Sequence, residues 1–227
     1  MSESLSGLEH FDGLARLFPL PSLVFFPNVM QPLHIFEPRY RQMTADALEG
    51  DRLIALALPR SGWEKTYAGA PAIHPVACLG SIVADQKLED GRYNLLLRGV
   101  SRIRVLEEID NGKLYRTARV ELLHDTPCAD DAEAAELRKR LIEFAPRLFP
   151  QTGQVKAEFR KLLMGPLPLG SLGDIAAFAL PLPAEFKQEL LEETDVRRRL
   201  TLFLTHLAAA APHADVDRKF PPDFSTN

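Results

Sequence analysis

Short apolar runs separated by turn residues dominate the first half of the chain. Some are nearly continuous, as in "DRLIALAL" at 51–58, and others alternate polar with apolar positions, as in "VSRIRVLEEI" at 100–109. Continuous runs are typical of strands covered on both faces, and alternation of strands with one exposed face. Asp90-Gly91 and Asn111-Gly112 are hairpin-turn pairs between such runs. Residues 1–125 are therefore predicted to form a barrel or compact sheet.

One helix is predicted within this strand-rich half, at residues 38–49. Its apolar positions recur at the spacing of one helical face: Tyr40, Met43, Thr44, Ala47 and Leu48. Pro38 suits the first helical position, and Gly50 suits the end of the helix.

The pattern changes near residue 126 from short strands to helical spacing. Helices are predicted after Asp130, at 155–165, at 170–180 and in two pieces within 183–211, with Asp130 and Asp195 as N-caps. Residues 126–211 are therefore expected to form an all-helical subdomain. The tail at 212–227 is rich in proline and lacks periodicity, so we expect it to be disordered. The predicted fold class is α+β, a β-barrel subdomain followed by a helical bundle.

Composition narrows the function classes. Hydrophobic residues make up 46% of the chain, charged residues 26%, and the net charge is −4, which gives no electrostatic reason to expect nucleic acid or an anionic membrane. The first twenty residues lack the apolar stretch of a signal peptide, and the longest apolar runs are too short to span a membrane. The expected compartment is the cytoplasm. Cys78 and Cys128 belong to no CxxC pair, so zinc is not expected. A single disulfide between them stays open, and a reduced pair is the favoured expectation.

Motifs for catalysis or cofactor binding are missing from the sequence. There is no P-loop pattern, no G-x-G-x-x-G and no G-x-S-x-G, and the histidines show no paired metal-ligand spacing. We therefore expect no catalytic residue, no metal and no cofactor.

Residues 32–41, "PLHIFEPRYR", gather the side chains of a possible acid–base site: His34, Glu37, Arg39, Tyr40 and Arg41. As a strand, this segment places His34 on the face opposite Leu33. Glu37 precedes a proline and marks the corner between strand and helix, beside the positive end of the helix dipole. The polar groups are thus predicted to diverge, which favours a structural role.

Aromatic residues offer a candidate surface for extended or unfolded polypeptide, because aromatic anchors dominate such interfaces. The candidates are Phe25, Phe26, Phe36, Trp63 and Tyr67. The alternative for the phenylalanines is a place in the core. Trp63 and Tyr67 lie in a long loop at 59–75, where binding and simple packing both remain open.

Arginines on neighbouring predicted strands offer a candidate face for nucleic acid: Arg92, Arg98, Arg102, Arg104, Arg116 and Arg119. Acidic residues are interleaved with them, which favours a mixed solvated face over an RNA-binding one.

Three stretches, "LFPLPSLVFFPNVMQPLHIFEPRYRQM", "VACLGSIVADQKLEDGRYNLLLRGVSRIRV" and "EFKQELLEETDVRRRLTLFLTHL", resemble the N-terminal substrate-binding domain of Lon ATP-dependent proteases, and in particular small stand-alone bacterial members. The signature residues of the resemblance are Pro27, Pro32, His34, Phe36, Glu37, Pro38, Arg39 and Tyr40. Asn28 departs from the family's usual glycine, but asparagine tolerates a positive φ better than most residues.

The resemblance implies a PUA-like β-barrel with a small helix, followed by a helical bundle. It also implies a role in holding protein substrates, whereas the ATPase and the Ser-Lys peptidase of full-length Lon lie outside this domain. We therefore expect a non-enzymatic module for unfolded or partly folded polypeptide, acting as an adaptor, a holdase-like binder or a regulator of a protease in trans, in protein quality control. The alternative is an RNA-binding PUA-like module, by fold-level analogy.

Overall fold

The computed structural model describes residue 8 and residues 11–66, 70–148 and 165–210. The strands are β1 (Leu14–Pro19), β2 (Met30–Ile35), β3 (Leu53–Ala57), β4 (Val76–Lys87), β5 (Tyr93–Ile109) and β6 (Arg116–Leu123). The helices are α1 (Pro38–Glu49), α2 (Asp131–Leu148), α4 (Leu169–Ala179), α5 (Ala184–Glu192) and α6 (Val196–Ala210), with a 3₁₀ helix, η2 (Trp63–Thr66). Strands come first and most helices follow, so the predicted α+β class is confirmed.

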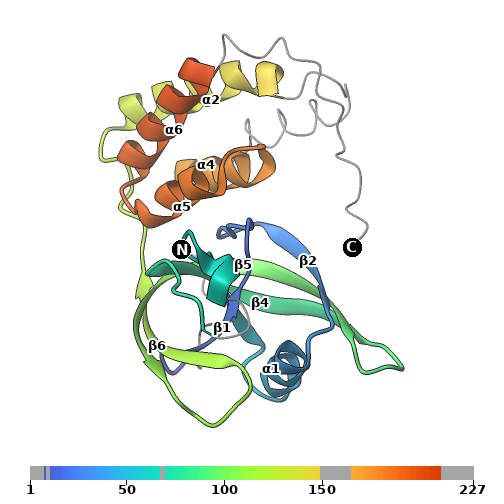
Figure 1. Cartoon of the computed structure of the whole chain (residues 1–227). Coiled ribbons are helices and arrows are strands. Elements are labelled where there is room, and N and C mark those ends of the chain that lie inside the picture. Colours follow the sequence, from blue (N-terminus) through green and yellow to red (C-terminus); the bar gives the residue numbers. More distant parts are fainter. Residues whose placement is uncertain (1–7, 9–10, 67–69, 149–164, 211–227) are drawn as a thin grey trace.

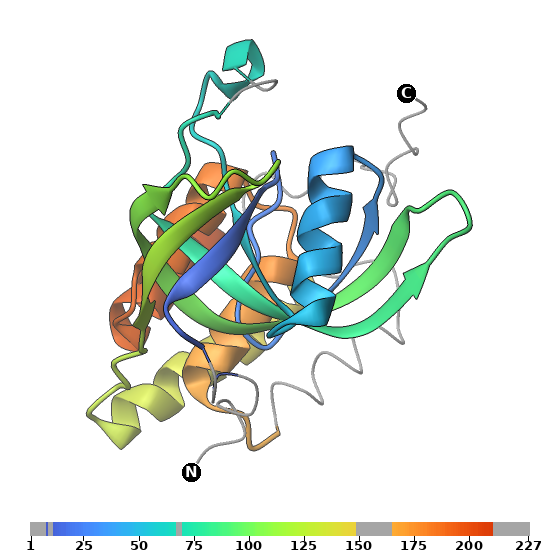
Figure 2. The same cartoon turned by 90° about the horizontal axis from the view of Figure 1, so that it is seen from below.

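The six strands form one mixed sheet in the order β2-β5-β4-β3-β1-β6. Only β1 and β3 run parallel among the described pairings. Because β5 is 17 residues long, it pairs with β2, β4 and β6, and the sheet curls around on itself (Figure 2). Strands β5, β4, β3, β1 and β6 pair in a ring through the β5–β6 pairing, whereas β2 pairs with β5 alone among the described strands. The expected barrel-like sheet is confirmed, in a form that is not a strictly closed barrel.

A close backbone approach joins β5 to the segment that leads into β2. The backbone amide of Asn28 donates to the carbonyl of Gly99 at 2.9 Å, and the backbone amide of Gly99 donates to the carbonyl of Val29 at 2.9 Å. A Cβ on Gly99 would lie 2.0 Å from the carbonyl oxygen of Phe26. Only glycine fits there, since any side chain would overlap the crossing backbone.

Helix α1 forms where its periodicity predicts. Pro38 is its first residue, and Glu37 before it is extended, with φ −65° and ψ 136°. Tyr40, Met43 and Ala47 are buried against the sheet. The predicted helix at 38–49 is confirmed, because local sequence sets both of its ends and its buried face.

Helices α2, α4, α5 and α6 pack together above the strands, whereas α1 lies at the other end of the sheet (Figure 1). We call residues 14–123 the sheet lobe and residues 131–210 the helical lobe. One cluster of buried apolar side chains spans both, with Phe25 and Leu97 from strands and loops and Leu172 and Phe203 from helices. The hydrophobic core is therefore continuous between the lobes, and the division at 125/126 into separate subdomains stays a prediction.

The predicted helix caps are present. Asp130 accepts a hydrogen bond from the amide of Ala132 at 2.8 Å, and Asp195 accepts one from the amide of Arg198 at 3.0 Å.

Tyr67, most of the helix predicted at 155–165 and the tail at 212–227 lie outside the described residues. Among the described residues, no helix combines the length and the apolar character needed to cross a membrane.

Replacing Gly99 with alanine is expected to destabilise the protein by about 3 kcal/mol or more, at the upper end of overpacking costs, because the obstacle is backbone. Gly112→Ala is the matched control, since Gly112 has a positive φ of 67° but nothing within 4 Å of its added Cβ. That control is expected to cost only about 1 kcal/mol of backbone strain. Urea unfolding measures the free energy of unfolding of the two variants. Equal losses of stability would contradict the close backbone approach at Gly99.

Candidate functional site

The two phenylalanines predicted to face a polypeptide are core residues. Phe25 is 1% exposed and Phe26 is 0% exposed. A Cβ on Gly80 would lie 2.9 Å from the Phe25 ring, and that ring also packs edge-on against Phe178 of α4 with centroids 6.5 Å apart. The expectation that Phe25 and Phe26 line a binding surface is therefore corrected, because both side chains are buried and Phe25 is packed between a strand glycine and a helix.

The aromatic loop at 59–75 has a fixed base. Pro59 and Ile73 form an antiparallel bridge, and the Ser61 hydroxyl donates to a Glu185 carboxylate oxygen of α5 at 3.3 Å. Trp63 begins η2 and is half-buried. Since Tyr67 lies outside the described residues, a polypeptide contact through Trp63 and Tyr67 stays a prediction.

The polar side chains of residues 32–41 turn to separate partners. The Nδ1 of His34 lies 2.8 Å from the Asn94 side-chain oxygen, and its Nε2 lies 3.2 Å from an Arg92 nitrogen. Glu37 instead forms an ion pair with Arg39 at 2.9 Å. These groups do not converge as an acid–base site would. Nor do the described residues contain a group of three or more His, Cys, Asp or Glu side chains arranged for a metal ion.

The polar groups that do converge lie between the lobes, where Arg102 of β5 meets Asp174 of α4. Arg102 is 3% exposed and Asp174 is 1% exposed. The two terminal nitrogens of Arg102 donate to the two oxygens of Asp174 at 2.9 and 2.6 Å, and its Nε donates to the carbonyl of Leu191 at 2.9 Å. Such a two-bond pair fixes both distance and orientation.

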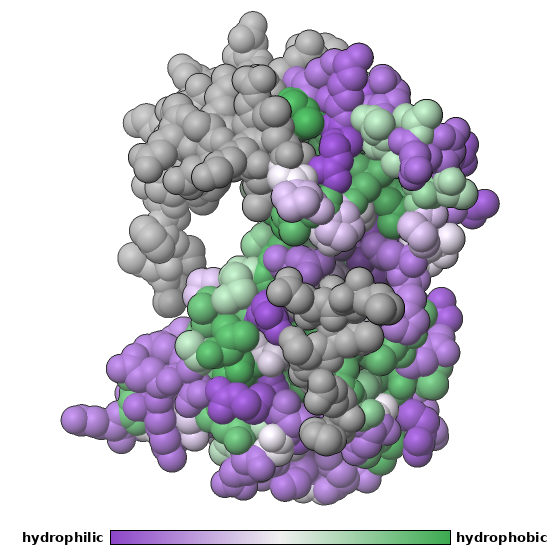
Figure 3. All heavy atoms as spheres, turned by 180° about the vertical axis from the view of Figure 1, so that it is seen from behind, coloured by the Kyte–Doolittle hydropathy of each residue, from purple (hydrophilic) through white to green (hydrophobic). Residues whose placement is uncertain are grey.

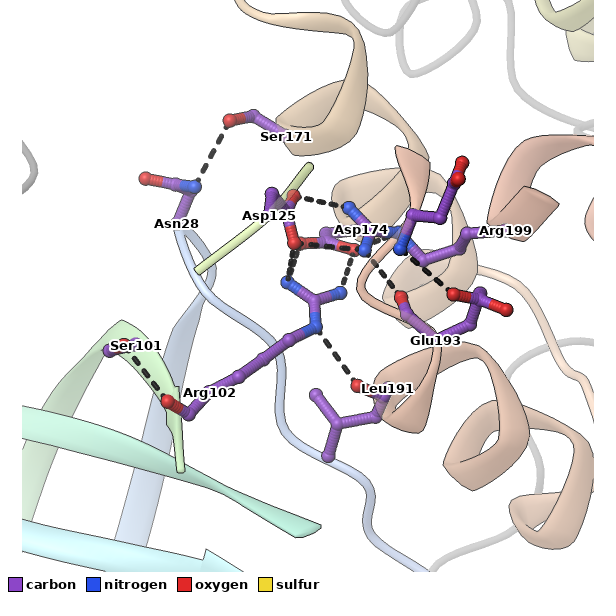
Figure 4. Close-up of polar contacts among 10 residues, drawn as sticks. Asn28, Ser101, Arg102, Asp125, Ser171, Asp174, Leu191, Glu193 and Arg199 are labelled. Atoms are coloured by element: carbon purple, nitrogen blue, oxygen red, sulfur yellow. Dashed lines mark hydrogen bonds and ion pairs between the residues drawn. The ribbon is translucent and has the colours of Figure 1, made fainter. Parts of the chain in front are cut away.

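A second pair completes this network (Figure 4). Arg199 of α6 is 2% exposed and donates to both oxygens of Asp125 at 3.0 and 2.5 Å, and also to the carbonyl of Glu193 at 2.7 Å. Arg102 lies 3.3 Å from Asp125, and Arg199 lies 3.4 Å from Asp174, so the pairs are cross-linked. We call Arg102, Asp125, Asp174 and Arg199 the interlobe clasp. Its two positive and two negative charges balance.

Burial makes the charges of Arg102, Asp174 and Arg199 depend on their partners, whereas the Asp125 side chain is partly exposed. Burial raises the pKa of Asp174, while Arg102 and Arg199 act in the opposite direction. Burial also disfavours the charged form of Arg102, but Asp174 outweighs it and the pKa of Arg102 lies above its usual value. The clasp therefore stabilises the lobes' arrangement only while all of its members are present.

The N-terminus of α4 is packed directly against the clasp. A Cβ on Gly170 would lie 2.6 Å from a carboxylate oxygen of Asp125 and 2.9 Å from a nitrogen of Arg199. Glycine at this position lets the helix approach the acidic side chain, which lies near the positive end of the helix dipole.

A groove of about 380 Å³ opens beside the clasp between the lobes. Its apolar lining residues are Leu8, Pro27, Val100, Leu123, Pro127, Ala134, Pro168, Leu169 and Val196. Its other lining residues are Asn28, Ser101, Arg102, His124, Asp125, Cys128, Gly170, Ser171 and Asp174. We call it the interlobe groove. An apolar lining with a few fixed polar groups is typical of ligand-binding sites.

Asn28 bridges the two walls of the interlobe groove. Its φ is 65°, as expected for asparagine in place of glycine, and its side-chain nitrogen donates to the hydroxyl of Ser171 in α4 at 3.1 Å. Unlike glycine, it therefore adds a hydrogen bond between the lobes.

The two cysteines lie in contrasting environments, and neither forms a disulfide. Cys78 is 0% exposed, and burial raises the pKa of its thiol. Cys128 is half-buried and lines the interlobe groove. Cys128 is thus the more accessible thiol.

The candidate nucleic-acid face does not form as a row of arginines. Arg102 lies inside the clasp, so its place on that face is corrected. Arg92 pairs with Asp90 at 2.6 Å, Arg104 with Glu121 at 2.6 Å, and Arg116 with Glu108. The remaining charges resemble the mixed solvated surface that the sequence favours.

A few large apolar side chains are exposed elsewhere. Met30, Phe36 and Val83, in or next to β2 and β4, are 45%, 61% and 43% exposed. On the rear face of the molecule, hydrophobic residues also gather on the sheet lobe close to the helical lobe (Figure 3). The interlobe groove is therefore not the sole apolar surface among the described residues.

The family model that matches the chain describes the substrate-binding domain of ATP-dependent protease La (LON), and it matches residues 15–209. The Lon protease of Anaeromyxobacter dehalogenans is 26% identical over 196 residues, which are 86% of this chain and 23% of the relative. The Lon protease of Paraburkholderia phytofirmans is 32% identical over 197 residues, 85% of this chain and 24% of the relative. The chain thus spans about a quarter of the length of these relatives.

Solved structures have the same fold. A Lon N-terminal domain protein from Xanthomonas campestris is 25% identical, with a TM-score of 0.62 over 85% of this chain and 97% of that one. The N-terminal domain of a Mycobacterium avium complex Lon protease has a TM-score of 0.67 over 86% of this chain and 98% of that one, at 17% identity. Their coverage extends over sheet and helical lobes alike.

Removing Asp174 is expected to be strongly destabilising, because two buried guanidinium groups would lose a carboxylate. Asp174→Ala should cost about 3–5 kcal/mol. The double variant Arg102→Met with Asp174→Ala removes one charge of each sign and should be more stable than Asp174→Ala alone. Urea unfolding measures the free energy of unfolding of the single and double variants. If the double variant loses as much free energy of unfolding as the two single variants, Asp174→Ala and Arg102→Met, lose together, the pair is not coupled as described.

The two thiols are expected to differ at least tenfold in their rate of alkylation by iodoacetamide. Cys128 should react in the folded protein, whereas Cys78 should react only after unfolding, because burial protects it and raises its pKa. Peptide mass spectrometry measures the two rates, and the same reaction in urea is the control. Equal rates in the folded protein would contradict the placement of Cys78.

Proposed function

The chain belongs to the family of LON substrate-binding domains, and we propose that it is a non-catalytic module that binds unfolded or partly folded polypeptide. The observation that carries this proposal is the interlobe groove, whose prolines, Leu169 and Val196 offer apolar walls. An extended polypeptide could place a few apolar side chains between these walls and hydrogen-bond to the polar groups of the lining.

The clasp suits the groove to this task. It ties β5, α4 and α6 into one arrangement, so that the groove walls are held apart before anything binds. A preformed site avoids the cost of ordering its own walls on association. Loss of the clasp would therefore weaken polypeptide binding as well as stability.

We further propose that the module acts as an adaptor or regulator, holding polypeptide for a protease in trans, in cytoplasmic protein quality control. Support comes from the matched relatives, which are Lon proteases, and from the match of this chain to their substrate-binding part. No peptide-bond or ATP hydrolysis is proposed for it, since the matched family model describes substrate binding.

An RNA-binding role has weaker support. The buried position of Arg102 and the ion pairs of Arg92, Arg104 and Arg116 leave no continuous row of unpaired cations among these residues. Phosphate contacts dominate RNA affinity, so such neutralised arginines would contribute little.

Binding of a reduced, alkylated and fluorescently labelled protein tests the polypeptide proposal. We expect fluorescence anisotropy to report binding by the natural chain, and Leu169→Ser in the groove to weaken it about five- to thirtyfold, as for loss of one apolar anchor. The double variant Trp63→Ala with Tyr67→Ala tests the loop as a second contact, and its circular dichroism should match that of the natural chain.

Two outcomes would contradict the proposal at different levels. If the natural chain binds none of several unfolded proteins, polypeptide binding is excluded. If the loop variant loses all binding while Leu169→Ser retains it, the site is the loop and not the interlobe groove.

A further inference from the structure

One rim of the interlobe groove is strongly acidic. Residues 120–137, which connect β6 to α2 and form the first turns of that helix, contain no lysine or arginine. Their carboxylates are Glu121, Asp125, Asp130, Asp131, Glu133 and Glu136. Within the same segment, Leu123, Pro127 and Ala134 contribute apolar lining to the groove.

Part of this negative charge is already balanced. Glu121 pairs with Arg104 at 2.6 Å, Glu133 with Arg197 at 2.7 Å, and Asp125 belongs to the clasp. Asp130 and Asp131 are exposed, and neither makes an ion pair with a described residue. These two carboxylates therefore carry negative charge at the start of α2 that no ion pair with a described residue balances.

The helix geometry directs that charge toward the groove. Asp131 precedes Ala134 by three residues, so both lie on the same side of α2. Ala134 lines the groove, so Asp131 lies within one helical turn of a lining residue. The rest of the lining includes the apolar Pro27, Pro168 and Leu169, and its charged members Arg102 and Asp174 form an ion pair with each other.

From this pairing of an apolar floor with an acidic rim, we propose that the interlobe groove selects extended polypeptide segments in which a short apolar stretch is flanked by lysine or arginine. The inference rests on the proposed function and adds the class of segment that the site prefers. The apolar stretch fills the space between the walls, and the flanking cations lie beside Asp130 and Asp131. Acidic segments are disfavoured by like-charge repulsion at the rim.

Three peptides with one apolar core and lysine, serine or glutamate flanks test this preference. We expect the lysine-flanked peptide to bind about three- to tenfold more tightly than the serine-flanked one at low salt. The glutamate-flanked peptide should bind more weakly than either, and the differences should shrink at 1 M salt, where the Debye length is about 3 Å. Each bound peptide should also slow alkylation of Cys128, which locates it in the groove.

Matched variants separate the effect of the rim carboxylates on peptide binding from the effect of the net charge of the protein. Asp130→Asn with Asp131→Asn removes two charges, and asparagine at 130 still caps α2. Glu49→Gln with Glu89→Gln removes two charges from exposed positions in the sheet lobe. The first pair should bring lysine- and serine-flanked peptides within twofold of each other, while the second should leave the preference intact.

The outcomes are distinct. Equal binding of all three peptides, or equal effects of the two variant pairs, would overturn the charge preference while polypeptide binding stands. Binding of no peptide would overturn the proposed function too. Protection of Cys128 before any peptide is added would overturn the inference as well, because a second copy or another part of this chain would then cover the groove.

Discussion

Two buried arginines and two aspartates set the geometry on which the rest of the molecule depends. Arg102 comes from the sheet, Asp174 and Arg199 from the helices, and Asp125 from the connection between them. In a medium of low dielectric, the buried charges of Arg102, Asp174 and Arg199 are not stable without their partners. The sheet lobe and the helical lobe are therefore held in one relative position, and the apolar groove beside the clasp keeps its shape.

This arrangement suits recognition better than catalysis. The groove brings together segments far apart in the sequence, among them those around Pro27, Cys128 and Leu169. Several of its polar side chains are bonded to one another, as in the Asn28–Ser171 contact and the Arg102–Asp174 ion pair. What the walls offer a ligand is apolar surface and, at one rim, negative charge, which are features suited to an extended segment of another protein.

Local features were predictable from sequence, and long-range ones were not. Helix α1 and the Asp130 and Asp195 caps follow from neighbouring residues alone, whereas the positive φ of Asn28 was expected from the family resemblance. Strand alternation correctly placed Arg102 opposite Ile103, but it could not show that helices cover that face and bury the arginine. Two distant glycines make room for this segment: Gly80 lies against the ring of Phe25, and Gly99 lies against the backbone of Phe26. Asp174 carried a signal, since it is the lone charged residue within the apolar sequence of α4.

Hydrogen–deuterium exchange of the natural chain, with and without an unfolded protein, tests most directly whether the interlobe groove is where polypeptide binds. The groove account predicts slower exchange at the start of α2, at the N-terminus of α4 and around Asn28, with little change in β2 and in the loop at 59–75. Protection confined to β2 or to that loop, with the groove segments unchanged, would contradict it.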